Sequence, residues 1–177
     1  PGEEKGFVPT PEWKNRERGE SLYLGDTYNI SIGQGDLSVT PLWLNSYISA
    51  IANGGDIYRP RVVNSIIDHD NLILELAPQV IGSLPFSKET INQMREAMKE
   101  TVMSGTAQIL KDLPVQVAAK TGTAEVIKGK TINSLFTVFA PYENPQITLT
   151  VLIEGATSQQ GLAIRVAHGF LKWYFSK

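Results

Sequence analysis

The stretch AAKTGTAE, at residues 118–125, is the part of this 177-residue chain that decides its fold. Lysine and glycine are both depleted in β-strands, and a glycine inside a strand weakens it. The apolar residues around the stretch nevertheless favour a strand, which we predict over residues 115–125. A local rule that is broken inside otherwise well-patterned sequence often marks a functional site. We therefore expect a ligand-binding segment in the middle of this strand.

The sequence after this strand predicts two more strands. The segments SLFTVFA (134–140) and QITLTVLIE (146–154) are rich in β-branched residues, and the second alternates apolar residues with threonines. A turn signal, KGK (128–130), separates the first two strands, and prolines flank the connection between the last two. Three successive strands joined by short turns predict an antiparallel meander.

Helices are predicted on both sides of the meander. The Thr-Pro pair at 40–41 favours a helix start, and the sequence NGG (53–55) favours its end. Ser87 begins a second helix, and a shorter one is expected over 106–110. A last helix is predicted over 159–174. Apolar residues at helical spacing are Ile91, Met94, Met98 and Val102 in the second helix, and Leu162, Val166, Phe170 and Trp173 on one side of the last.

The remaining segments are a hairpin and a long N-terminal stretch. RVVNSIID (61–68) and residues 72–76 read as two strands joined by the turn signal HDN (69–71). Residues 1–35 are rich in glycine, proline and charge, and we predict an irregular segment there. Helices and an antiparallel sheet that are segregated along the chain predict an α+β fold.

Composition excludes several classes of function. The 16 basic and 18 acidic residues lack the basic excess of a nucleic-acid-binding surface. The chain has no cysteine, which excludes disulfides, thiolate metal sites and a cysteine nucleophile. Its two histidines, His69 and His168, have no partner at metal-ligand spacing, so neither zinc nor another cofactor is expected. No apolar stretch approaches the ~20 residues that span a bilayer.

The segment KTGT has the groups that an anion-binding site needs. Lys120 supplies positive charge, and Thr121 and Thr123 offer hydroxyls to a carboxylate, while Gly122 lets a ligand lie against the strand. The alternative is a plain edge strand, in which Lys120 reaches solvent and Gly122 forms a β-bulge. A P-loop at GKT (129–131) is a poor interpretation, because the motif's earlier glycine is an alanine and the segment lies between two strands.

Four segments in a fixed order carry a resemblance to a known family. They are GDTYNISIGQGDLSVTP (25–41), AIANGGDIYRPRVV (50–63), SGTA (104–107) and AAKTGTAE (118–125). Together they resemble class B penicillin-binding proteins of the elongation type, the penicillin-binding protein 2 group, over almost the whole chain. The resemblance implies the C-terminal part of the transpeptidase fold shared with serine β-lactamases, an antiparallel sheet with packed helices.

The resemblance also implies a function. Family members are serine-type D,D-transpeptidases that cross-link peptidoglycan: a serine attacks a D-Ala-D-Ala stem peptide, releases D-Ala and passes the acyl group to an amine. β-Lactams acylate the same serine. By this match Lys120 contributes positive charge and a link to a second serine, and Thr121 and Thr123 hold the terminal carboxylate. The backbone N–H of Thr123 is one of two oxyanion-hole donors, and Gly122 keeps the strand open to the ligand.

The family's other two motifs are absent from this sequence. No serine is followed by lysine at the third position, as in S-x-x-K, or by asparagine or aspartate at the second, as in S-x-N. Residues 1–177 are therefore expected to be the C-terminal portion of a transpeptidase domain, inert alone, with its nucleophile upstream. A non-catalytic binding or sensor module and a decayed paralogue are the alternatives.

The resemblance further implies partners and a location. The expected partners are the stem peptide, β-lactams, the missing N-terminal part of the same protein and the elongation machinery, but no nucleic acid. The parent protein is expected at the periplasmic, extracytoplasmic face of the bacterial cell membrane. Its contact with the membrane is expected only through an N-terminal anchor that this sequence does not contain.

Overall fold

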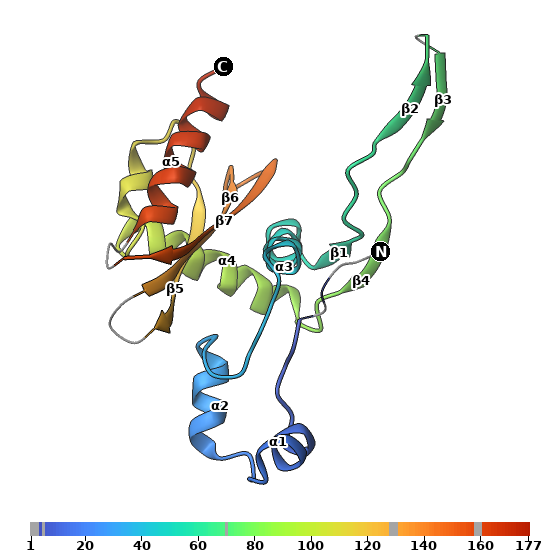
Figure 1. The fold of residues 1–177 in the computed structure, drawn as a ribbon. Coiled ribbons are helices and arrows are strands. Elements are labelled where there is room, and N and C mark those ends of the chain that lie inside the picture. The colour runs from blue at the N-terminus through green and yellow to red at the C-terminus, as the bar shows by residue number, and fades with distance from the viewer. Residues whose placement is uncertain (1–3, 5, 70, 128–130, 158–160) are drawn as a thin grey trace. The chain divides into compact units, whose positions relative to one another are not determined.

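The computed structural model describes residues 4, 6–69, 71–127, 131–157 and 161–177 (Figure 1). The chain divides into two compact units, residues 1–44 and 45–177. The described elements are helices and antiparallel sheets. This confirms the predicted α+β class. In chain order the elements are α1 (Pro11–Arg18), α2 (Leu24–Ser31), α3 (Pro41–Asn53), β1 (Asp56–Tyr58), β2 (Ser65–Asp68), β3 (Asn71–Glu75), β4 (Val80–Ser83), α4 (Lys88–Met103), the 3-10 helix η1 (Gln108–Asp112), β5 (Ala118–Ile127), β6 (Thr131–Ala140), β7 (Ile147–Ala156) and α5 (Leu162–Phe175).

The first unit contains two short helices, so the prediction of an irregular segment over residues 1–35 is wrong. Thr10 caps α1 by accepting a hydrogen bond from the Trp13 N–H at 3.2 Å, and Pro11 is the first helical residue. Gly19, at φ 67°, ends the helix. The same Thr-Pro signal that predicts α3 also begins α1. The helix has too few apolar residues for their spacing to reveal it.

A buried lysine joins the two helices of this unit. Lys14 in α1 is only 8% exposed and forms an ion pair with Asp26 in α2. Its ammonium group also lies 4.9 Å from the centre of the Tyr23 ring. The hydrogen bond to Asp26 raises the pKa of Lys14, and the same bond lowers the pKa of Asp26. Because a buried charge must be paired, this contact explains how a lysine fits at an inward position.

Helix α3 leads into a ribbon of paired strands in the second unit. Thr40 accepts the Trp43 N–H at 3.2 Å, and Gly54 and Gly55 follow the helix at φ 94° and 129°, which confirms both predicted ends. The predicted hairpin is confirmed as β2–β3, although its first strand covers only Ser65–Asp68 and not 61–68. One residue of its expected turn, residue 70, lies outside the described part. The pairing of β1 with β4 extends the ribbon and was not predicted.

Strands β5, β6 and β7 form the predicted antiparallel meander, in that order. The first strand begins at Ala118 and not at 115, and the turn expected at 128–130 lies outside the described residues. The pairing of β5 with β6 is continuous from Ala118 to Glu125. Helix α4 confirms the predicted start, because Ser87 accepts the Thr90 N–H at 3.1 Å. The short helix expected over 106–110 is the 3-10 helix η1, two residues further on at its start.

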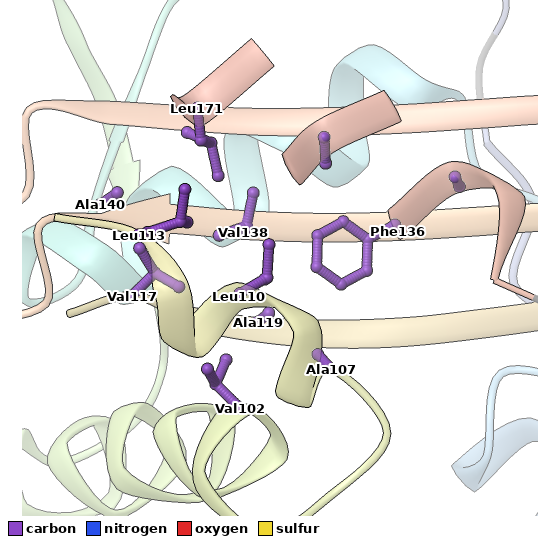
Figure 2. Close-up of a cluster of buried hydrophobic side chains, with 12 residues drawn as sticks. Val102, Ala107, Leu110, Leu113, Val117, Ala119, Phe136, Val138, Ala140 and Leu171 are labelled. Atoms are coloured by element: carbon purple, nitrogen blue, oxygen red, sulfur yellow. The ribbon is translucent and has the colours of Figure 1, made fainter. Parts of the chain in front are cut away.

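The main core lies between the meander and the elements α4, η1 and α5. Figure 2 shows Leu110 of η1 and Phe136 of β6 within one apolar cluster, with Val102 of α4 and Leu171 of α5 on opposite sides of it. Ala107, just before η1, is fully buried in the same cluster. As predicted, one alternating set of residues in β7 packs against this core: Ile147, Leu149, Val151 and Ile153.

Helix α5 does not bury the side on which the sequence places its large apolar residues. Val166 and Trp173 on that side are 54% and 56% exposed. The fully buried residues are instead Ala163, Ala167 and Leu171. Small alanine side chains let the helix lie close to the sheet, so the side with the largest apolar residues is not the buried one. The expected helix start at residue 159 lies outside the described residues.

Candidate ligand-binding strand

The segment KTGT (120–123) lies in the middle of β5, an edge strand of the three-stranded sheet. Its four residues pair in register with residues 134–137 of β6. Successive side chains of a strand point to opposite faces, so Lys120 and Gly122 share one face while Thr121 and Thr123 share the other. A ligand can therefore meet all four positions only along the edge of β5 that faces away from β6.

Lys120 is exposed, and its side chain lies against its own strand. The Nζ atom donates a hydrogen bond to the carbonyl oxygen of Thr121 at 2.7 Å. An ammonium group has three donors, so this bond does not exhaust its capacity. The contact places a positive charge beside the β5 backbone, where it can attract an anionic ligand.

Thr121 is half-buried and contacts a residue from outside the sheet. Its hydroxyl lies 2.9 Å from the hydroxyl of Thr106, in the segment SGTA (104–107) between α4 and η1. The sequence names SGTA as one of four ordered segments but gives no reason to place it beside the KTGT strand. Thr106 is therefore a residue of the site that sequence reasoning missed, and only the fold brings it to Thr121.

Gly122 is not part of a β-bulge. The pairing of β5 with β6 is uninterrupted from Ala118 to Glu125, which excludes the bulge interpretation at this position. A Cβ atom added to Gly122 would lie 3.3 Å from the Cβ of Leu135, its partner in β6. The missing side chain thus has a structural role in the sheet, in addition to the predicted role of leaving room for a ligand.

Thr123 is exposed and pairs with Ser134 of β6. Ser134 is buried, and its hydroxyl accepts a hydrogen bond from the Ala163 N–H at 3.3 Å. Ala163 lies in the first turn of α5 and is itself fully buried. The end of the candidate segment is therefore fixed through β6 to the start of α5.

The described part of the chain contains neither a candidate metal cluster nor a candidate membrane-spanning helix. Within it, no group of three or more histidine, aspartate or glutamate side chains lies close enough together to hold a metal ion. No helix in the same residues has both the length and the apolar character needed to cross a bilayer.

Comparison with known proteins gives consistent results. Residues 1–170 match the family described as the penicillin binding protein transpeptidase domain. Peptidoglycan D,D-transpeptidase MrdA of Acinetobacter baumannii is 35% identical over an alignment of 170 residues that covers 87% of this chain and 25% of that protein. Penicillin-binding protein 2 of Helicobacter pylori, solved in complex with MreC, superposes with a TM-score of 0.77 at 27% identity, over 99% of this chain and 31% of that one. Penicillin-binding protein A of M. tuberculosis, solved as an imipenem acyl-enzyme complex, gives 0.69 at 29% identity, over 84% and 33%.

The fold and the KTGT segment together define a class of protein. It is an α+β domain in which a K-T-G edge strand lies beside a core that helices cover. The chain belongs to the penicillin-binding protein transpeptidase family. Its likeness to MrdA and to penicillin-binding protein 2 confirms the resemblance to the elongation-type group. The chain spans only a quarter to a third of the lengths of these three proteins.

Proposed function

We propose that this chain supplies the carboxylate-binding strand of a peptidoglycan D,D-transpeptidase. The observation that carries the proposal is the KTGT segment on the edge strand of a sheet, in a chain that belongs to a transpeptidase family. Lys120 contributes positive charge, and Thr121 and Thr123 bind the terminal carboxylate of a stem peptide or a β-lactam. The N–H of Thr123 is one of two donors to the oxyanion of the reacting carbonyl.

The nucleophile is a serine of an S-x-x-K motif outside these 177 residues, which contain no such motif. Its hydroxyl oxygen bonds to the carbonyl carbon of the penultimate D-Ala and loses its proton. The peptide C–N bond breaks, the nitrogen takes up a proton and D-Ala leaves. An amine of a second stem peptide then attacks the acyl-serine ester, which forms the cross-link and restores the hydroxyl. In both steps the Thr123 N–H and Lys120 stabilise the negative charge that develops on the carbonyl oxygen.

The proposal extends to the place of action of the whole protein. We place it at the extracytoplasmic face of the membrane, held by an anchor outside these 177 residues, and in contact with the elongation machinery. The support for such a partner is that the Helicobacter pylori relative was solved in complex with MreC.

The proposal is tested by an intact-mass spectrum after incubation with a reactive penicillin. The full-length protein that carries this chain is expected to gain the mass of the penicillin at the serine of its S-x-x-K motif. The 177-residue chain alone, at 19.5 kDa, is expected to stay unmodified. An adduct on the isolated chain, or none on the full-length protein, contradicts the proposal.

Replacement of Lys120 tests the role of the strand itself. K120A in the full-length protein is expected to lower the second-order rate constant of acylation by about a hundredfold, because a charge aimed at the developing oxyanion is lost. The matched control is K88A, since Lys88 is an exposed lysine at the start of α4. Equal rates in K120A and the wild type contradict the assigned role.

A further inference from the structure

Which hydroxyl donates in the hydrogen bond between Thr106 and Thr121 depends on what else Thr121 binds. Their oxygen atoms lie 2.9 Å apart, so one hydroxyl donates and the other accepts. A hydroxyl has a single proton to donate and two lone pairs that accept. If Thr121 donates its proton to an anionic carboxylate, it must accept from Thr106. A ligand carboxylate therefore selects one of the two possible arrangements of the pair.

The segment that carries Thr106 is held firmly at the end of α4. The Gly105 N–H donates to the Glu100 carbonyl at 3.1 Å, and the Ala107 N–H donates to the Thr101 carbonyl at 3.0 Å. A Cβ atom on Gly105 would lie only 2.9 Å from the Thr101 backbone, so glycine is required for this close approach. The Gln108 side chain donates to the carbonyl oxygens of Ser104 and Gly105, at 3.2 Å each.

The next residue anchors the segment in the core. Ala107 is fully buried in the apolar cluster that also contains Ala119 of β5 and Phe136 of β6 (Figure 2). Ala119 lies two positions before Thr121 and on the same face of the strand. The distance between the Thr106 and Thr121 hydroxyls is thus set in part by the buried cluster that contains Ala107 and Ala119, and not by the two threonine side chains alone.

We propose that Thr106 is a positioning residue that directs the hydroxyl proton of Thr121 toward the ligand carboxylate. The inference rests on the proposed function, because it assigns a purpose to the Thr106 hydroxyl only if Thr121 binds a carboxylate. It makes the selection of acidic over neutral ligands depend on a residue outside the KTGT strand. Since both hydroxyls can otherwise bond to water, their contact adds little to stability, and its main effect is on the orientation of Thr121.

The test compares a penicillin with its methyl ester in the full-length protein. The ester has no anionic carboxylate but keeps the β-lactam ring, so the ratio of the two acylation rate constants reports recognition of the carboxylate. T106V removes the hydroxyl at nearly constant shape, and T106S keeps it. The matched control is T90V, which breaks another exposed pair of hydroxyls, Ser87 and Thr90, 3.0 Å apart in a different part of the fold.

T106V is expected to lower the rate constant for the acid by about fivefold to tenfold, the effect of a weakened hydrogen bond to a charged group. The constant for the ester is expected to stay unchanged, and T106S and T90V are expected to keep the wild-type ratio. A T106V protein with the wild-type ratio overturns the inference, whether both constants are retained or both fall equally. A wild-type protein that is not acylated, or that reacts equally with acid and ester, overturns the proposed function and the inference with it.

Discussion

At the scale of single residues, Arg95 in α4 connects three segments of the second unit. Its guanidinium group donates hydrogen bonds to the carbonyl oxygens of Ala52, at the end of α3, and of Tyr142, after β6, the latter at 2.7 Å. It also lies 5.4 Å from the centres of the Phe139 and Tyr142 rings. A planar group with several donors can make both bonds while it stacks on the rings. Lysine has one nitrogen and cannot reproduce this geometry.

R95K is therefore expected to lower the free energy of unfolding by about 2 kcal/mol, the usual value of one hydrogen bond to a charged group. Urea denaturation followed by circular dichroism measures this change. R16K is the matched control, because the Arg16 side chain is 72% exposed, and its effect is expected to stay within about 0.5 kcal/mol. If both variants unfold at the wild-type midpoint, the contacts of Arg95 do not stabilise the fold.

The residues that sequence reasoning found and missed differ in how far apart their partners lie. The KTGT segment is visible because it breaks strand preferences within one short stretch. Arg95 bonds to residues 43 and 47 positions away, and Thr106 contacts a residue 15 positions away. No local pattern encodes such contacts, since they depend on the packing of whole elements. The role of a residue in a local motif could thus be predicted, but its tertiary support could not.

At the scale of elements, helix α5 shows where apolar spacing misleads. Leu162, Val166, Phe170 and Trp173 recur at helical intervals, yet the helix buries Ala163, Ala167 and Leu171. The spacing of apolar residues correctly predicts an amphipathic helix, but large side chains dominate that pattern. The short packing distance between the helix and the sheet favours small side chains on the buried side. The strands of the meander were predicted better, because alternation leaves only two faces to choose between.

The corrected face of α5 leads to a paired prediction. L171A is expected to lower the free energy of unfolding by about 2–5 kcal/mol, because Leu171 is fully buried and its loss leaves a cavity. V166A, on the side that the sequence favoured, is expected to cost no more than about 0.5 kcal/mol. Both are measured by chemical denaturation. A larger loss for V166A than for L171A reverses the assignment of the buried face.

At the scale of the whole molecule, the order of the four segments predicts the family independently of the predicted helices and strands. Each of the four segments is a short run of consecutive residues, so the sequence alone is enough to recognise it. The division into two units and the two helices of the first unit are harder to predict from the sequence. Those helices depend on end caps and on the ion pair of Lys14 with Asp26, not on an apolar stripe. Such polar contacts do not recur at a fixed spacing along the chain, so the sequence does not reveal them.

The exposure of the β2–β3 hairpin indicates how much this part of the chain contributes to stability. Every residue of both strands is exposed, including Ile67 at 65% and Ile73 at 63%. Figure 1 shows the two strands continuing the ribbon that β1 and β4 begin. The pairing of β1 with β4 closes with a bond from the Arg59 N–H to the Gln79 carbonyl at 2.8 Å. The ribbon can therefore be closed at this point without its outer part.

Replacement of residues 61–77 by an Asn-Gly turn is expected to change the free energy of unfolding by less than about 1 kcal/mol, since all described side chains that it removes are exposed and loop length has a small effect. L84A is the contrasting variant: Leu84, just after β4, is buried and its N–H donates to the Gly55 carbonyl at 2.8 Å. L84A is expected to lower the free energy of unfolding by about 2–5 kcal/mol.

Denaturation midpoints measured across a range of protein concentrations separate two explanations if the shortened chain proves unstable. A loss that shrinks when both proteins are diluted means that a second copy covers the apolar hairpin, because dilution removes that stabilisation from the wild type. A loss independent of concentration means that the hairpin supports its own chain.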